Sequence, residues 1–295
     1  MTRIVPDFVP SHSALPDKVD VVVIGGGIIG VCTALTLAEH GVRIALCEKG
    51  LIGGEQSGRN WGWVRQMGRD PAELPLAMLS LARWKEMNER TGEETGFRQS
   101  GIAYLCRNAR QEAEYEAWLV HAQNYGLDTR LLHQDELRRH LPGMTDGFSA
   151  ALYTSTDGRA EPLKATPAIA RAAIRAGAHV LTGCAVRAVE RSAGRISGVI
   201  TEKGPITCPT VVLAGGAWSR LFAGNMGLDL PQLKVLGTVA RLTPSPGFRT
   251  CRSAPTILRS GVGWTVAFRS PCGTPMSRQS CRTAFDFSLI SFPPL

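Results

Sequence analysis

The sequence predicts an α/β protein that opens with a Rossmann-type parallel sheet. Three observations predict this fold class. A run of β-branched residues, 21–24, is followed by three glycines and then by a periodic apolar segment, 28–40. A second apolar run, 42–47, ends in the acidic residue Glu48. These segments form one strand–helix–strand unit of about thirty residues, the usual length of a βαβ unit.

Length and composition describe an ordinary globular chain. Its 295 residues suffice for one large or two moderate domains, with 44% hydrophobic and 20% charged residues. The net charge of +8 comes from arginines scattered among acids, which predicts a solvated surface and no nucleic-acid partner. The eight cysteines show no metal-ligand spacing, so we expect no metal site. Residues 1–17 have no apolar core, and no stretch is long enough to cross a bilayer, which predicts a soluble cytoplasmic protein.

The later elements are predicted in chain order from hydrophobic periodicity and from breaker residues. Residues 49–70 are polar and rich in glycine, and we interpret them as an extended active-site loop. Helices are expected over 71–90, over 109–124 with Asn108 as N-cap, over 133–141 and over 162–176. Strands are expected over 101–106, 179–181, 185–190, 196–201 and 210–214, with a turn at Gly204 and Pro205.

A glycine motif, Gly25-x-Gly27-x-x-Gly30, lies between the first strand and the first helix. Its first glycine allows a tight turn, its second lets a pyrophosphate approach the backbone, and its third lets helix and strand pack closely. The helix N-terminus supplies N–H groups and the positive end of the helix dipole. Glu48, at the end of the second strand, can accept hydrogen bonds from ribose hydroxyls. The motif therefore predicts a dinucleotide site, with a simple glycine-rich turn as the alternative.

The loop after Glu48 bears on the choice of dinucleotide. A nicotinamide enzyme usually proceeds promptly from this acid to another helix and strand. Here residues 49–62 form a polar, glycine-bearing loop that can follow a flavin dinucleotide past its pyrophosphate. This favours FAD, while an NAD-dependent dehydrogenase and a surface Ω-loop stay open as alternatives.

Several motifs in this order resemble the D-amino acid oxidase superfamily, and in particular its branch of glycine and sarcosine oxidases, D-amino acid dehydrogenase small subunits and opine oxidases. They are the 25–30 turn, Glu48, the loop Ser-Gly-Arg-Asn-Trp-Gly at 57–62 and the segment Val-Val-Leu-Ala-Gly-Gly-Ala-Trp-Ser at 211–219. The resemblance covers residues 18–268. It implies a discontinuous, GR2-like FAD domain over 18–96 and 150–228 and an interleaved, incomplete α+β substrate domain over 97–149 and 229–268. Irregular tails are expected at 1–17 and 269–295.

The resemblance also implies a function: FAD-dependent oxidation of the CH–NH bond of an amine or D-amino acid-like substrate. Relatives occur alone and in multi-subunit complexes, so a partner subunit is one alternative. No catalytic residue is assigned, since the six histidines show no partner pattern. Arg259 is a candidate anchor for the substrate, with a surface arginine as the alternative.

Cofactor contacts carried over from the family fall on five segments. They are Gly25, Gly27 and Gly30 at the pyrophosphate, Glu48 and Lys49 at the ribose, Ser57, Asn60 and Gly62 along the flavin, Val186 at the adenine through its backbone, and Ala214, Gly215 and Trp218 closing over the dinucleotide. For Val186 an ordinary core valine is the alternative, and for Trp218 a core aromatic.

The resemblance stops after residue 268. Family members return there to the flavin domain with a glycine-rich segment, and nothing in 269–295 matches it. This predicts a chain whose C-terminal part is missing through truncation or a frameshift. An inactive remnant of the flavin fold is therefore an alternative function.

Overall fold

The computed structural model describes residues 5–140, 147–234, 257–260 and 264–266. These residues form two compact units. Among the described residues, the first unit contains 5–62, Glu86–Phe97 and 160–234. The second contains Trp63–Lys85, the described part of Arg98–Arg159, and the two strands after residue 256. The predicted tail 269–295, and with it the truncation hypothesis, lies outside the described residues.

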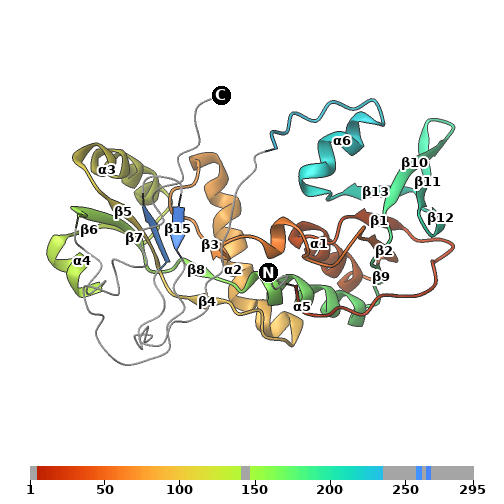
Figure 1. Ribbon diagram of the computed structural model, residues 1–295, viewed down its shortest axis with the longest axis horizontal. Coiled ribbons are helices and arrows are strands. Elements are labelled where there is room, and N and C mark those ends of the chain that lie inside the picture. Colours follow the sequence, from red (N-terminus) through yellow and green to blue (C-terminus); the bar gives the residue numbers. More distant parts are fainter. Residues whose placement is uncertain (1–4, 141–146, 235–256, 261–263, 267–295) are drawn as a thin grey trace. The chain divides into compact units, whose positions relative to one another are not determined.

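A four-stranded sheet forms the centre of the first unit, and each of its strands runs parallel to its neighbours (Figure 1). Its order is β13 (Thr210–Leu213), β1 (Val21–Ile24), β2 (Ile44–Cys47) and β9 (His179–Leu181). β1 comes first in the chain but lies inside the sheet, between β13 and β2. The carboxyl ends of these three strands therefore meet at one edge, where ligands of open α/β sheets bind.

The two central strands, β1 and β2, are buried on both faces, as the unbroken β-branched run predicts. On one face, Val22 and Ile24 belong to a core cluster that also contains residues of β10 (Val186–Ser192), β11 (Arg195–Thr201) and β12 (Gly204–Thr207). Because side chains alternate along a strand, Val23 points to the other face, toward Gly30 of α1 (Ile28–Glu39). There α1 packs against α5 (Pro162–Arg175) (Figure 1).

The first unit also includes segments with little regular structure. Residues 5–17 contain no helix or strand, but Asp7 N donates to Leu163 O and His12 N donates to Val180 O, both at 2.9 Å. After β13 the chain forms a short turn, η3 (Gly216–Trp218), and then α6 (Ser219–Gly224). Within the loop after β2 lies another single turn, η1 (Gln56–Gly58). Both turns flank the carboxyl edge of the parallel sheet.

In its described residues, the second unit contains two sheets and three helices. The larger sheet has the order β15 (Trp264–Val266), β14 (Ile257–Ser260), β5 (Ile102–Cys106), β7 (Ala150–Thr154) and β6 (Thr129–His133). The smaller sheet has the order β3 (Trp63–Val64), β8 (Gly158–Arg159) and β4 (Arg98–Gln99). The helices are α3 (Ala109–Asn124), α4 (Gln134–His140) and the greater part of α2 (Leu74–Thr91), which follows the turn η2 (Pro71–Glu73).

Most of the longer elements match the sequence predictions, whereas the short strands β4 and β8 and the helix α6 were not predicted. Gly204 and Pro205 begin the edge strand β12 instead of forming a turn, and the hairpin reverses at residues 202 and 203. Proline is tolerated there because an edge strand need not donate every backbone hydrogen bond. Strands β6 and β7 were not predicted at all. The 49–70 loop is interrupted by η1 and β3.

Candidate dinucleotide site

A cavity of about 280 Å³ opens at the carboxyl edge of the parallel sheet, within the first unit. Segments from five parts of the chain line it: residues 24–27, 47–49, 51–57 except 52, 185–187, and 213–225 in part. Small-molecule sites commonly have volumes of about 300–1,000 Å³. The cavity thus has the size for a part of a dinucleotide.

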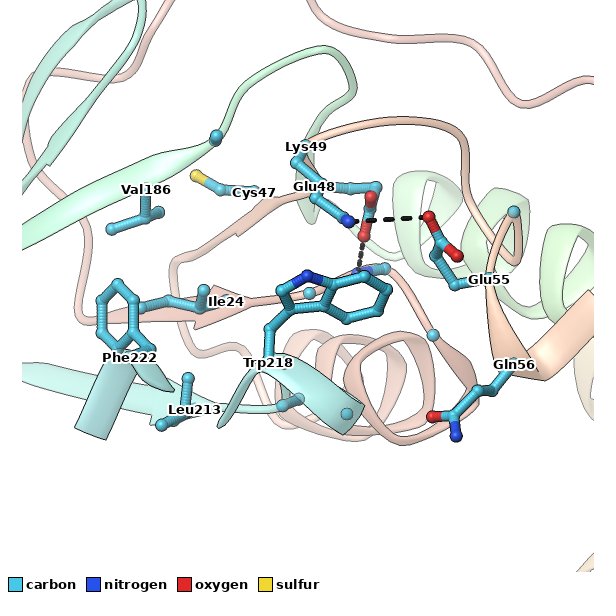
Figure 2. A pocket seen from close by; sticks show the side chains of 18 of the residues that line it. Ile24, Cys47, Glu48, Lys49, Glu55, Gln56, Val186, Leu213, Trp218 and Phe222 are labelled. Carbon is cyan, nitrogen blue, oxygen red and sulfur yellow. Dashed lines mark hydrogen bonds and ion pairs between the residues drawn. The ribbon is translucent and has the colours of Figure 1, made fainter. Parts of the chain in front are cut away.

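The lining of the cavity changes character from one side to the other (Figure 2). On one side of Trp218, Figure 2 shows the apolar side chains of Ile24, Val186, Leu213 and Phe222. On the other side lie polar groups, among them Glu55 and Gln56. This arrangement suits a ligand with a flat apolar end and a charged end.

Both the available space and the backbone conformation require glycine in the turn 25–30. Gly25 has φ +112°, and a Cβ on it would lie 2.4 Å from Ala214 O. A Cβ on Gly30 would lie 1.8 Å from Gly25 O, and one on Gly27 would lie 3.1 Å from Ser57 Oγ. Contacts below 3.0 Å are not tolerated without movement of the backbone. Side chains at Gly25 and Gly30 would therefore displace β1, β13 or α1.

The N-terminus of α1 is directed at the cavity. Its N-cap is Gly27, which has no side chain to satisfy the first N–H groups, and its first turn carries no acidic residue. Ser57 Oγ accepts a hydrogen bond from Ile28 N at 2.9 Å. The positive end of the helix dipole and the unsatisfied N–H groups of the first turn favour an anion here.

Glu48 is buried at the end of β2, and the backbone fixes its carboxylate. Oε2 accepts from Gly26 N at 2.7 Å (Figure 2). Oε1 accepts from Gly50 N, also at 2.7 Å. Each carboxylate oxygen has a further lone pair for a hydroxyl donor. The glycine turn and the acid are thus joined by a direct hydrogen bond, which places both groups around one ligand.

Lys49 and Trp218 meet at the cavity. The Lys49 Nζ atom lies 3.4 Å from the centroid of the Trp218 ring and 3.5 Å from Glu55 Oε1 (Figure 2). A cation over an indole ring is attracted by its negative face. The ammonium group therefore connects the exit of β2 with the turn that follows β13.

Nine of the sequence-predicted site residues line this cavity: Gly25, Gly27, Glu48, Lys49, Ser57, Val186, Ala214, Gly215 and Trp218. Gly30 lies behind the turn, against Gly25. Asn60 shapes the loop, since its Nδ2 donates to Gln56 O and Ser57 O and its Oδ1 accepts from Gly62 N. Gly62 has φ +72° and accepts from Ala160 N through its carbonyl oxygen. The predicted anchor Arg259 lies in β14, paired in register with Tyr104.

Sequence reasoning missed several lining residues. Leu221, Phe222 and Asn225 belong to α6 or its end, and no sequence signal connects that helix with the glycine turn. Glu55 and Gln56 lie in the loop that was predicted to follow the cofactor, but they were not singled out. The polarity of the loop indicated that it follows the cofactor, but it did not identify which of its side chains line the cavity.

Fold and cavity together define a dinucleotide-binding α/β protein. A sequence profile described as FAD dependent oxidoreductase (DAO) matches residues 20–270, and the chain belongs to this family. FAD is the cofactor of the family, which confirms the predicted family and cofactor and argues against the NAD alternative.

Three relatives illustrate the similarity. Mouse mitochondrial sarcosine dehydrogenase is 30% identical over 74% of this chain and 24% of its own length. Glycine oxidase from Pseudomonas aeruginosa is 31% identical over 74% of this chain and 60% of its own. The structure of L-amino acid deaminase from Proteus myxofaciens, in complex with anthranilate, is 40% identical with a TM-score of 0.73, over 77% of this chain and 52% of that one.

The chain spans between about a quarter and three fifths of the length of these relatives. The residues present fit the ADP part of FAD. The glycine positions leave a cradle that a Cβ would fill, the N-cap residue of α1 has no capping side chain, and Glu48 offers acceptor oxygens beside both. No helix in the described part of the chain is both long and apolar enough to span a membrane.

Proposed function

We propose that the cavity holds the ADP part of FAD and that the protein oxidises the CH–NH bond of a small amino acid or amine. The observation that carries the proposal is the hydrogen bond between Gly26 N and Glu48 Oε2, at 2.7 Å. It brings the phosphate-binding turn and the ribose-binding acid together at the edge of one parallel sheet.

The adenosine end is assigned to the apolar side of the cavity. Ile24, Val186 and Phe222 supply flat contact surface for an adenine ring. Glu48 then accepts hydrogen bonds from the ribose hydroxyls, and Lys49 lies beside them. This order follows the change in lining that Figure 2 shows, from apolar to polar.

The pyrophosphate is assigned to the turn 25–27 and the first turn of α1. Glycines at 25 and 27 let the backbone approach the phosphate oxygens, and the helix dipole stabilises their charge. Ser57 shapes this end through its hydrogen bond to Ile28 N. Asn60 and Gly62 hold the following loop in its path toward the flavin.

Bound FAD supplies the electron chemistry, by accepting a hydride from the substrate carbon. Sarcosine, glycine and L-amino acids, named for the relatives above, share an amine on the carbon next to a carboxylate. We propose the same substrate class here.

The cofactor proposal is tested by titrating the purified full chain with FAD and following flavin fluorescence. Glu48→Gln keeps the shape of the side chain but removes its charge, and we expect the Kd to rise about tenfold or more, since hydrogen bonds to a charged group contribute roughly 1.5–3 kcal/mol. Glu73→Gln is the matched control, because Glu73 is exposed and lies in the second unit. Equal affinities for all three proteins would contradict the assignment of Glu48.

The activity is tested separately, with a dye as electron acceptor and with sarcosine, glycine, and D- and L-amino acids as substrates. Dye reduction by one of them supports the proposed reaction. FAD binding without dye reduction by any of them favours the second candidate, a flavin-binding remnant without turnover.

The location and the partners are also proposals. We propose a cytoplasmic protein, supported by five cysteines that are free among the described residues. A partner subunit would show as a larger complex when the protein is isolated from its native source by gel filtration.

A further inference from the structure

The N-terminal segment (residues 5–17) covers the outer edge of β9, which is the last strand of the parallel sheet (Figure 1). His12 N donates to Val180 O at 2.9 Å, and Val180 N donates to His12 Nδ1 at 3.1 Å. One turn further, Thr182 N donates to Ser11 Oγ at 3.0 Å. An uncovered edge strand would present these N–H and C=O groups to other chains. Two side chains of the segment thus replace part of the pairing that a neighbouring strand would supply.

Two histidine rings are stacked where the segment meets β9. The ring centroids of His12 and His179 lie 3.9 Å apart, and the ring planes are inclined by 27°. His179 Nε2 lies 2.7 Å from Ala14 O and donates to it, because a carbonyl oxygen can only accept. Both histidines are half-buried, so protons from the solvent reach the rings.

The contact of His12 with β9 requires a neutral ring. His12 Nδ1 lies 3.1 Å from both Val180 N and Val180 O. Since Val180 O already accepts from His12 N, the neutral ring accepts from Val180 N and carries its own hydrogen on Nε2. A protonated imidazole carries a hydrogen on both nitrogens, so Nδ1 can no longer accept. Protonation of His12 therefore leaves Val180 N without its acceptor.

The environment of His179 also favours the neutral form. Burial lowers the pKa of His179, its hydrogen bond with Ala14 partly offsets this, and the charge of His12 lowers the pKa further. Because this pKa is lower in the folded chain than in the unfolded chain, the neutral ring stabilises the fold above about pH 6.5. The stabilisation is lost as the pH falls through the lower, folded-state pKa.

Other charged side chains on the elements around the pair have partners of their own or lie along the segment and α5. The paired ones are Arg171 and Arg175 with Glu93, Arg43 with Asp20, Glu202 with Arg187, and Lys203 with Thr182 O. The remaining ones are Asp7, Asp17 and Lys18 of the segment and Lys164 of α5. Within the described part of the chain, His12 is the charged group that shifts the pKa of His179.

β9 also supports the backbone of the ribose-binding acid. Leu181 O accepts from Glu48 N, and Glu48 O accepts from Cys184 N, both at 2.8 Å. Val180 bonds to the N-terminal segment on one side of β9, and the next residue, Leu181, bonds to Glu48 on the other. A change at the outer edge of β9 is therefore one residue away from the support of Glu48.

We propose that the stacked pair of His12 and His179 is an acid-sensitive latch for the N-terminal segment. At neutral pH the two uncharged rings hold the segment on β9. Protonation of both rings removes the acceptor of Val180 N and brings two positive charges together, so the segment leaves β9. Its release uncovers the edge of β9 and loosens the backbone of Glu48. The latch goes beyond the proposed function and does not depend on FAD binding.

The test measures amide hydrogen exchange of the full chain without cofactor, residue by residue, from pH 5 to 8. Each rate is divided by the intrinsic exchange rate at the same pH, which gives a protection factor. Between pH 7.5 and 5.5 we expect protection of Val180 N and Thr182 N to fall about tenfold or more, as for the loss of about one hydrogen bond. Protection of Glu48 N is expected to fall with them. Protection of Val23 N in β1 is expected to stay constant, which distinguishes local release from global unfolding.

Three variants complete the test. His12→Asn keeps an acceptor near the position of Nδ1 but cannot be protonated, so protection of Val180 N should persist at pH 5.5. His12→Ala should lose this protection at both pH values. His40→Asn is the matched control, because His40 Nδ1 also contacts a backbone carbonyl, Thr36 O at 2.7 Å, but lies at the end of α1. It should behave as the wild type does.

Two results would overturn the latch. One is a wild-type protection factor of Val180 N that does not change with pH, and the other is an equal fall in His12→Asn. Constant protection of Glu48 N, while Val180 N is released, would overturn the link to the ribose-binding acid.

Discussion

Gly30→Ala gives the sharpest test of the glycine turn. The added methyl group would lie 1.8 Å from Gly25 O and 3.0 Å from Gly25 C, so α1 and the turn have to separate by more than about 1 Å. This displacement moves the first N–H groups of α1 away from the pyrophosphate. Losing one or two charge-assisted hydrogen bonds costs about 2–4 kcal/mol, which raises the Kd for FAD by about 30- to 1,000-fold.

Gly224→Ala is the matched control. Gly224 also lies in a helix, α6, and a Cβ there would meet no atom within 4 Å. Because alanine favours helix by about 1 kcal/mol over glycine, we expect unchanged FAD affinity and equal or higher stability. Fluorescence titration with FAD gives the affinities, and urea unfolding shows whether each variant is folded. Wild-type FAD affinity in a folded Gly30→Ala protein would refute the assignment of this turn.

Three further predictions concern single groups. Burial raises the pKa of Asp157 from 3.8 to about 6. The protonated carboxyl group therefore contributes to the free energy of unfolding below pH 3.8, and this contribution is lost as the pH rises through about 6. Urea unfolding should show wild type losing about 2 kcal/mol relative to Asp157→Asn between pH 4 and 7, and parallel curves would contradict this. Lys49→Met removes the cation over Trp218 and should weaken FAD binding, measured by fluorescence titration, by about 1 kcal/mol. A loss of binding free energy larger than that of Glu48→Gln would contradict this. Arg171→Met, which breaks a half-buried pair with Glu93, should destabilise the protein by about 1–2 kcal/mol in urea, while Arg110→Met, at an exposed pair, should have no measurable effect.

The βαβ unit could be predicted because its signals are local. β1 and β2 consist of apolar residues. The glycines between them occur where a tight turn and a close approach of helix and strand leave no space for a side chain. By contrast, β7 is rich in alanine, which has low β-propensity, and it is a strand because β5 and β6 pair with it on both sides. Pairing partners far away in the sequence leave no local signal.

The same distinction applies to the site. The turn 25–27 and Glu48 belong to one βαβ unit, so their meeting follows from its geometry. Ala214 and Trp218 come from a strand much later in the chain, and only the family resemblance pointed to them. Phe222 and Asn225 reach the cavity through the path of α6, which depends on tertiary packing.

The central claim is that the first unit binds FAD through its ADP part. Its most direct test is displacement of FAD from the purified full chain by ADP and by FMN, followed by gel filtration and the visible spectrum of the protein fraction. The account predicts that the flavin bands elute with the protein, that excess ADP removes them, and that FMN neither binds nor displaces FAD. A protein that takes up no FAD, or that loses it to FMN and not to ADP, would contradict the account.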